Sequence, residues 1–186
     1  MKRALTSIAM ACAMVFIWAS DASASQPYVG VGLGLYNINT GLNKKSTFGE
    51  YLQVGDDFSQ YLGGEFRIGT SNKTSGATAA APAAKMDWMA AFYLKPRYEF
   101  SSDLTAYGLV GLGTIRASFY PAGAVKQTKT RSGLGYGLGL QYRTSDQFSL
   151  AAEWSHLLTK PKNATATRFN GISASMFTIS GKYHFW

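Results

Sequence analysis

Apolar and polar residues alternate along most of this 186-residue chain, which is the pattern of β-strands with two different faces. The C-terminal segment is the clearest example, because Phe177, Ile179 and Phe185 share one face while Lys182 and His184 lie on the other. The pattern predicts eight strands, over residues 27–37, 46–55, 58–71, 86–100, 104–119, 131–144, 147–159 and 173–186.

The connections between these segments alternate in length. Three are short, at 56–57, 101–103 and 145–146, whereas those at 38–45, 72–85, 120–130 and 160–172 are longer. An even number of strands with short turns at one end and long loops at the other is typical of outer-membrane barrels. The faces opposite the apolar ones are rich in Gly and Ala, which suits the crowded lumen of a small barrel. We therefore expect an all-β fold, an eight-stranded antiparallel up-and-down transmembrane β-barrel, with a soluble β-sandwich as the alternative.

The first 24 residues have the features of a signal peptide. Lys2 and Arg3 precede an apolar run over residues 4–19, and Ala22-Ser23-Ala24 forms a small-x-small cleavage site. The run is shorter than the ~20 residues that a membrane helix needs. We expect cleavage after Ala24, which leaves residues 25–186 as the barrel domain. The only cysteine, Cys12, lies in the predicted signal peptide, so no disulfide is expected in the barrel.

Aromatic residues gather near the ends of the predicted strands. Such residues form girdles at the two membrane–water interfaces of transmembrane barrels. The residues assigned to the girdles are Tyr28, Tyr36, Trp88, Tyr98, Phe100, Phe119, Tyr120, Tyr142, Phe148, Trp154 and Phe185.

The chain resembles the small eight-stranded outer-membrane barrels of the OmpA-like and opacity-porin type over most of residues 27–186. The resemblance rests on Tyr28-Val29-Gly30-Val31-Gly32-Leu33-Gly34, on Pro96-Arg97-Tyr98-Glu99-Phe100, on Gly137-Leu138-Gly139-Leu140-Gln141-Tyr142-Arg143 and on the aromatic C-terminus. It implies location in a bacterial outer membrane. It also implies that a terminal aromatic signal, here Tyr183, Phe185 and Trp186, is read by the barrel assembly machinery, although the family usually ends in Phe.

The distribution of charge refines this interpretation. The chain has 18 Lys and Arg against 10 Asp and Glu, for a formal net charge of +8. Because an unpaired buried charge is costly, we expect the inward charges to form a salt-bridged plug. The alternative is a narrow pore that favours anions, since basic groups outnumber acids six to three. The residues assigned to the interior are Glu65, Arg67, Lys95, Arg97, Glu99, Arg116, Arg143, Glu153 and Lys182.

The long loops and the adjoining strand ends are basic, whereas the short turns carry Asp. If the long loops are extracellular, their cations meet the phosphates of lipopolysaccharide. A host surface or an acidic glycan is the other anionic partner considered. The residues assigned to this surface are Lys44, Lys45, Lys73, Lys126, Lys129, Arg131, Lys160, Lys162 and Arg168.

The sequence does not favour catalysis. Ser155 and His156 are adjacent and close to Glu153, but consecutive residues of a strand point to opposite faces, so they do not form a nucleophile and its base. No Cys, His or carboxylate cluster has metal-ligand spacing. We therefore expect no enzyme activity, cofactor or metal, with a lipid A-modifying enzyme as the remaining alternative.

The function expected from the sequence is a structural and surface-interacting role in the outer membrane. Its expected partners are membrane lipid and lipopolysaccharide, the assembly machinery during insertion, and an unidentified host or cell-surface ligand, without nucleic acid. A narrow anion-favouring porin is the main alternative.

Overall fold

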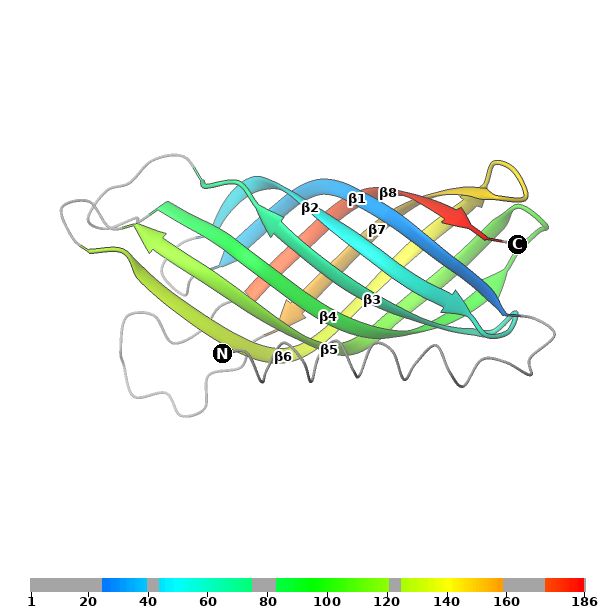
Figure 1. The fold of residues 1–186 in the computed structure, drawn as a ribbon, viewed down its shortest axis with the longest axis horizontal. Helices are drawn as coiled ribbons and strands as arrows, with labels where there is room; N and C mark the ends of the chain where they lie inside the picture. Colours follow the sequence, from blue (N-terminus) through cyan, green and yellow to red (C-terminus); the bar gives the residue numbers. More distant parts are fainter. Residues whose placement is uncertain (1–24, 40–43, 75–82, 121–124, 159–172, 186) are drawn as a thin grey trace.

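The computed structural model describes residues 25–39, 44–74, 83–120, 125–158 and 173–185. These residues form eight strands (Figure 1): β1 (Gln26–Asn39), β2 (Lys44–Asp57), β3 (Leu62–Ser71), β4 (Ala83–Glu99), β5 (Leu104–Tyr120), β6 (Gln127–Arg143), β7 (Phe148–Leu158) and β8 (Ser173–His184). No helix within these ranges is long and apolar enough to span a membrane.

The strands close into a barrel. Each strand pairs antiparallel with the next in chain order, and β8 pairs with β1. Tyr28 of β1, for example, lies opposite Gly55 of β2 and His184 of β8. Closure pairs the backbone groups of every strand on both sides, which is what a lipid environment requires. The predicted eight-stranded all-β barrel is confirmed.

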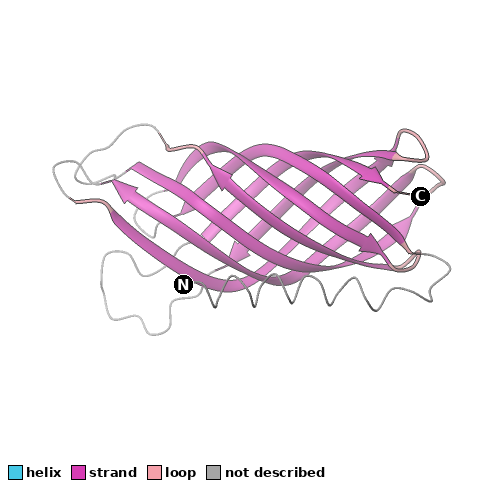
Figure 2. Ribbon diagram, viewed as in Figure 1, coloured by secondary structure: helices cyan, strands magenta, loops and turns pink. Residues whose placement is uncertain are grey.

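The two ends of the barrel differ in their connections. At the short-turn end, residues 58–61, 100–103 and 144–147 join strands, and β1 begins and β8 ends there (Figure 2). At the other end, which we call the long-loop end, the connections are 40–43, 72–82, 121–126 and 159–172. The predicted alternation of connections holds, although the first of the loops is only four residues long.

The first short turn lies later in the chain than expected. Asp56 and Asp57 were predicted to form the turn, but both belong to β2, where Asp57 lies opposite Gly63. The turn instead uses residues 58–61, where the backbone amides of Tyr61 and Leu62 donate to Ser59 Oγ at 3.2 and 3.1 Å. The shift places the side chain of Asp57 inside the barrel rather than in water.

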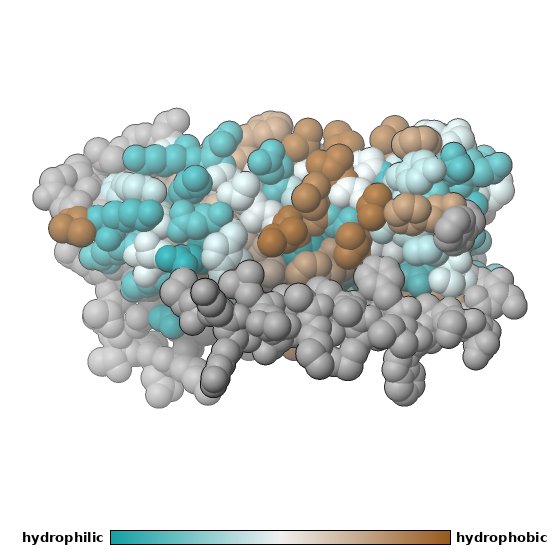
Figure 3. All heavy atoms as spheres, viewed as in Figure 1, coloured by the Kyte–Doolittle hydropathy of each residue, from teal (hydrophilic) through white to brown (hydrophobic). Residues whose placement is uncertain are grey.

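The outward face of the barrel carries an apolar belt. Large exposed side chains come from every strand, among them Val31, Leu52, Ile68, Leu94, Leu112, Leu138, Leu150 and Ile179. On the face seen in Figure 3, apolar residues gather over the middle of the barrel and polar residues lie toward its ends. The belt is the surface that the lipid chains cover.

An aromatic girdle borders the belt at the short-turn end. Tyr98 contacts Phe100 edge-on, with ring centroids 5.2 Å apart, and Tyr183 contacts both Phe148 and Phe185 at 5.1 and 5.6 Å. Three residues assigned to the girdles are placed elsewhere, because Tyr28, Tyr36 and Phe119 lie on the inward phase of their strands and are buried in the lumen. Position near a strand end therefore does not distinguish aromatic residues of the girdle from those of the lumen. The face of the strand on which the residue lies does distinguish them.

Aromatic rings and glycines interlock in the lumen. A Cβ added to Gly32 would lie 2.2 Å from the ring of Tyr51, and one added to Gly139 would lie 2.3 Å from Tyr107. Both pairs are direct cross-strand neighbours. The glycine-rich inward faces leave the space that these rings fill, so the lumen is packed rather than hollow.

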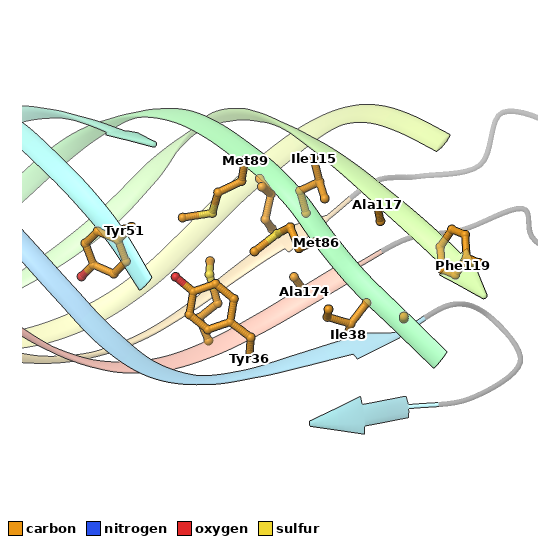
Figure 4. Packing of buried hydrophobic residues seen from close by; sticks show 12 residues of the cluster. Tyr36, Ile38, Tyr51, Met86, Met89, Ile115, Ala117, Phe119 and Ala174 are labelled. Atoms are coloured by element: carbon orange, nitrogen blue, oxygen red, sulfur yellow. The ribbon is translucent and has the colours of Figure 1, made fainter. Parts of the chain in front are cut away.

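The half of the lumen toward the long-loop end is filled by apolar side chains. Tyr36, Ile38, Met86, Met89 and Ile115 form one buried cluster with Tyr51, Ala84, Ala117, Phe119, Leu157, Ala174 and Met176. Figure 4 shows these side chains converging from β1, β2, β4, β5 and β8 across the interior. This apolar cluster lies between the long-loop end and the charged side chains described below.

The ladder between β3 and β4 ends before the strands do. Backbone pairing of β3 with β4 stops at Gly69 and Met89, close to a bulge between Met86 and Trp88 in the ladder of β4 with β5. Side-chain hydroxyls continue the contact, since Thr70 Oγ1 donates to the carbonyl of Met86 at 3.1 Å and Ser71 Oγ accepts the amide of Met86 at 3.0 Å. The barrel wall is therefore closed here by side-chain hydroxyls together with a backbone hydrogen bond from Thr74 N to the carbonyl of Ala84 at 2.8 Å.

The glycine–tyrosine packing predicts a difference between two glycine substitutions. Gly32→Val should destabilise the barrel by about 1–3 kcal/mol, because the new side chain displaces the buried ring of Tyr51. Gly181→Val is the control, since a Cβ at this outward position meets nothing within 4 Å. Urea unfolding in lipid vesicles, followed by tryptophan fluorescence, measures both. Equal effects of the two substitutions would contradict the packing account.

Candidate functional site

The centre of the lumen is organised around Arg67 of β3. Its Nη1 and Nη2 donate to the two carboxylate oxygens of Glu153 at 2.5 and 2.6 Å, and its Nε donates to Glu65. The guanidinium also lies over the rings of Tyr51 and Tyr93, with its central carbon 4.6 and 5.3 Å from their centroids. A bidentate pair with a second carboxylate and two aromatic faces compensates the buried guanidinium without solvent.

Glu65 joins this centre to the short-turn end. The hydroxyl of Tyr28 donates to Glu65 at 2.5 Å and accepts from Lys95 Nζ at 3.0 Å. Lys182 Nζ lies 3.6 Å from Glu65 Oε2, the oxygen that accepts from Tyr28, and donates to Gln141 Oε1 at 3.0 Å. These contacts connect β1, β3, β4, β6 and β8 across the lumen.

Asp57 is the carboxylate of the lumen that lies nearest the short-turn end. Its two oxygens lie 2.7 Å from Lys95 Nζ and 2.6 Å from Arg97 Nη1. Arg97 reaches outward to Glu99 at 3.2 Å, where the Glu99 side chain is 43% exposed. We call the whole set the lumen network; its charged members are Asp57, Glu65, Arg67, Lys95, Arg97, Glu153 and Lys182.

The charge balance of the lumen differs from the sequence-based count. Three carboxylates face four cations among the buried side chains of the lumen network, rather than three facing six. Arg116 was assigned to the interior, but it is exposed on the outer wall between buried Ile115 and Ala117. The run of glycine and apolar residues at 108–113 hid the phase of β5, and its inward members proved to be Leu109 and Ile115.

The other interior assignments lie inside the barrel or at its mouth. Glu65, Arg67, Lys95, Arg97, Glu153 and Lys182 are buried, whereas Glu99 and the half-buried Arg143 lie at the short-turn end. Arg143 Nη2 donates to Gln26 Oε1 at 3.3 Å. Sequence reasoning missed Asp57, because an Asp-Asp pair is the usual sign of a turn. The alternation along β2 could have identified it, because Asp57 lies on the same face of the strand as Tyr51 and Gln53.

The long-loop end carries a concentration of cations, which we call the basic rim. Its described members are Lys44, Lys45, Lys73, Lys126, Lys129 and Arg131. Lys73 and Lys126, from different connections, both lie over the ring of Tyr120, with their Nζ atoms 4.1 and 5.6 Å from its centroid. Lys160, Lys162 and Arg168 lie outside the described residues.

The residues considered for catalysis are on opposite faces, as expected. Ser155 is buried in the lumen, while His156 faces outward beside the rings of Tyr136 and Trp154. His156 Nδ1 shares a hydrogen bond of 2.6 Å with Ser175 Oγ of β8. Within the described part of the chain, no group of three His, Cys, Asp or Glu residues could hold a metal ion. Of the terminal aromatic signal, Tyr183 and Phe185 lie in the girdle, and Trp186 is outside the described residues.

The chain matches the family described as the outer membrane protein beta-barrel domain over residues 4–185. It belongs to this family. The protein is therefore a bacterial outer-membrane barrel. No curated protein matches the chain at a significant level.

Solved structures of other outer-membrane barrels have the same fold. Neisserial surface protein A superposes with a TM-score of 0.70 at 17% identity, covering 86% of this chain and 97% of that one. The attachment invasion locus protein Ail of Yersinia pestis gives 0.60 at 15% identity, covering 87% and 99%. OprG of Pseudomonas aeruginosa gives 0.54 at 14% identity, covering 90% and 98%. At these identities the likeness concerns the fold.

The buried arginine predicts a strong asymmetry between breaking and replacing an ion pair. Arg67→Met should cost about 3–5 kcal/mol of unfolding free energy, because Glu153 stays buried without its cation. The double variant Arg67→Met/Glu153→Gln should recover much of that loss, since Glu65 keeps Tyr28 and Lys182. Urea unfolding in vesicles measures both variants. Equal losses would show that the packing of Arg67 on Tyr51 and Tyr93, rather than its charge, is what stabilises the barrel.

Proposed function

We propose that the protein is a closed, non-conducting barrel that presents the basic rim to anionic groups, either of lipopolysaccharide or of another anionic surface. The observation that carries the proposal is the contrast between the two charged regions. The cations of the lumen network face carboxylates. The basic rim, in contrast, has six cations in the part of the chain that the structure describes. The acids described at that end of the barrel, Glu50 and Asp87, both lie on the outer wall. The proposed role is non-enzymatic.

The orientation of the barrel supports an external role for the basic rim. Bacterial outer-membrane barrels have short turns on the periplasmic side and longer loops on the extracellular side. The long-loop end then lies where lipopolysaccharide carries its phosphates. Each Lys or Arg near an anionic membrane surface contributes about 1 kcal/mol of attraction.

Two cations of the basic rim are held in a position suited to anions. Lys73 follows β3 and Lys126 precedes β6, yet both stack on Tyr120 at the end of β5. The shared ring brings cations from two connections together and limits their freedom, so less entropy is lost when an anion binds. The Ail structure, which was solved in complex with the heparin analogue sucrose octasulfate, supports the choice of a polyanion as the first ligand to test.

A closed lumen predicts the absence of ion conduction. The refolded protein in planar bilayers should give no conductance steps, because the lumen network and the apolar cluster fill successive layers of the interior. A known porin, added to the same bilayer, shows that the assay detects channels. Reproducible anion-selective steps from the refolded protein would contradict the closed lumen and favour the narrow-porin alternative.

Neutralising the basic rim should weaken binding to polyanions. The variant Lys73→Gln/Lys126→Gln/Arg131→Gln should bind heparin more than tenfold more weakly at low ionic strength, given about 1 kcal/mol per cation. The difference should shrink as salt is added. Retention of the detergent-folded barrel on immobilised heparin measures the effect.

The matched control changes charge at the other end of the barrel. Asp103→Asn/Asp146→Asn, in the short turns, should leave heparin retention almost unchanged. If this control altered binding as much as the rim variant, net charge rather than the basic rim would be responsible. Unchanged binding by the rim variant would overturn the proposed function.

A further inference from the structure

Arg116 is an outward-facing cation on the lipid side of the barrel wall. It belongs to β5, where its neighbours Ile115 and Ala117 are buried in the lumen. Its cross-strand partners are Trp88 of β4 and Thr130 of β6, and Arg116 itself is exposed. Its side chain therefore extends from the outer wall rather than into the mouth of the barrel.

The height of Arg116 follows from its neighbours on the same face. Leu112 and Leu134 form the last apolar cross-strand pair of the belt on β5 and β6, and they are 65% and 58% exposed. The next outward pair is polar, since Thr114 Oγ1 and Ser132 Oγ share a hydrogen bond of 2.8 Å. Arg116 follows two residues further toward the long-loop end, about 7 Å along the strand. It lies just beyond the hydrocarbon, at the level of the lipid headgroups.

The surroundings of Arg116 leave its charge available. Its side chain forms no ion pair or hydrogen bond with any residue that the structure describes. Asp87 of the β4 bulge, the residue before Trp88, accepts a hydrogen bond from Ser118 Oγ at 2.5 Å. Lys85, opposite Ser118 on β4, adds a second cation one row closer to the long-loop end. Trp88 is the kind of side chain that settles at a membrane interface beside such a cation.

We propose that Arg116, with Trp88 and Thr130 beside it, forms a lipid-facing site for a phosphate of lipid A in the outer leaflet. The planar guanidinium offers two parallel donors to a phosphate, the Thr130 hydroxyl offers a third, and the indole of Trp88 lies against the lipid. The site is distinct from the basic rim, because it faces the membrane and not the solvent. It rests on the orientation used for the proposed function, but not on binding of polyanions by the rim.

The far end of the barrel supplies a matched control. Arg143 of β6 lies at the short-turn end, where its Nη2 donates to Gln26 Oε1. It carries the same charge as Arg116 but belongs neither to the basic rim nor to the lipid-facing wall at the long-loop end. A comparison of Arg116→Gln with Arg143→Gln therefore separates a local lipid contact from an effect of net charge.

The experiment measures binding of lipid A to the folded, detergent-solubilised barrel by native mass spectrometry. Bis-phosphorylated lipid A is the probe, dephosphorylated lipid A tests the phosphate, and the heat-dependent shift on an SDS gel checks that each variant is folded. Arg116→Gln should weaken binding of the phosphorylated probe about five-fold, the equivalent of about 1 kcal/mol for one cation at an anionic surface. Arg143→Gln should leave it unchanged, and the dephosphorylated probe should not distinguish Arg116→Gln from the wild type.

Three outcomes would overturn the site. They are unchanged binding in Arg116→Gln, an equal loss in Arg143→Gln, and displacement of lipid A by phosphatidylglycerol at equal concentration, which would indicate a general anionic-lipid contact. Heparin retention separates this proposal from the proposed function. Loss of lipid A binding in Arg116→Gln, together with normal heparin retention of the rim variant, would refute the role of the basic rim and leave the lipid A site standing.

Discussion

The pairing of β1 with β8 is the constraint on which the rest of the structure depends. In lipid, an unpaired backbone amide or carbonyl costs several kcal/mol, so a sheet is stable there only when it has no edge. Closing eight strands makes a barrel just wide enough to be filled by side chains. The filled lumen, the alternation of the two faces and the concentration of recognition at the ends of the barrel all follow from that closure.

A narrow lumen explains why its residues occur in complementary pairs. Each inward tyrosine needs a glycine beside it, as Tyr51 has Gly32 and Tyr107 has Gly139. Each inward charge needs a partner, as Arg67 has Glu153 and Asp57 has Arg97. Such contacts hold strands together across the barrel as well as around it. The interior thereby serves the stability of the barrel, and the groups available for recognition are those of the basic rim and of the outer wall.

The outer wall meets two different environments, because the membrane has an apolar interior and polar headgroups. Residues beyond the last apolar pair of a strand lie among the headgroups instead of the lipid chains. Cationic side chains are favourable at that level, because the headgroups are anionic. Leu112, Thr114 and Arg116 follow this change from apolar to hydroxyl to cation along one face of β5. The basic rim continues the same positive character beyond the wall. The barrel therefore carries cations on two surfaces, the outer wall at Arg116 and the basic rim at the long-loop end.

Much of this protein could be predicted from its sequence, because strand alternation is local: it depends on neighbours along the chain. The eight strands, the inward Glu65 and Arg67, and the opposite faces of Ser155 and His156 were all accessible in this way. Local alternation failed where glycines obscure the phase, which misplaced Arg116, and where turn chemistry competes with strand continuation, which hid the role of Asp57. Only the tertiary structure decided that Arg67 meets Glu153, because β3 and β7 are not paired and their side chains meet across the lumen. Contacts across a closed barrel depend on the accumulated register of all its strands, and no stretch of sequence contains that information alone.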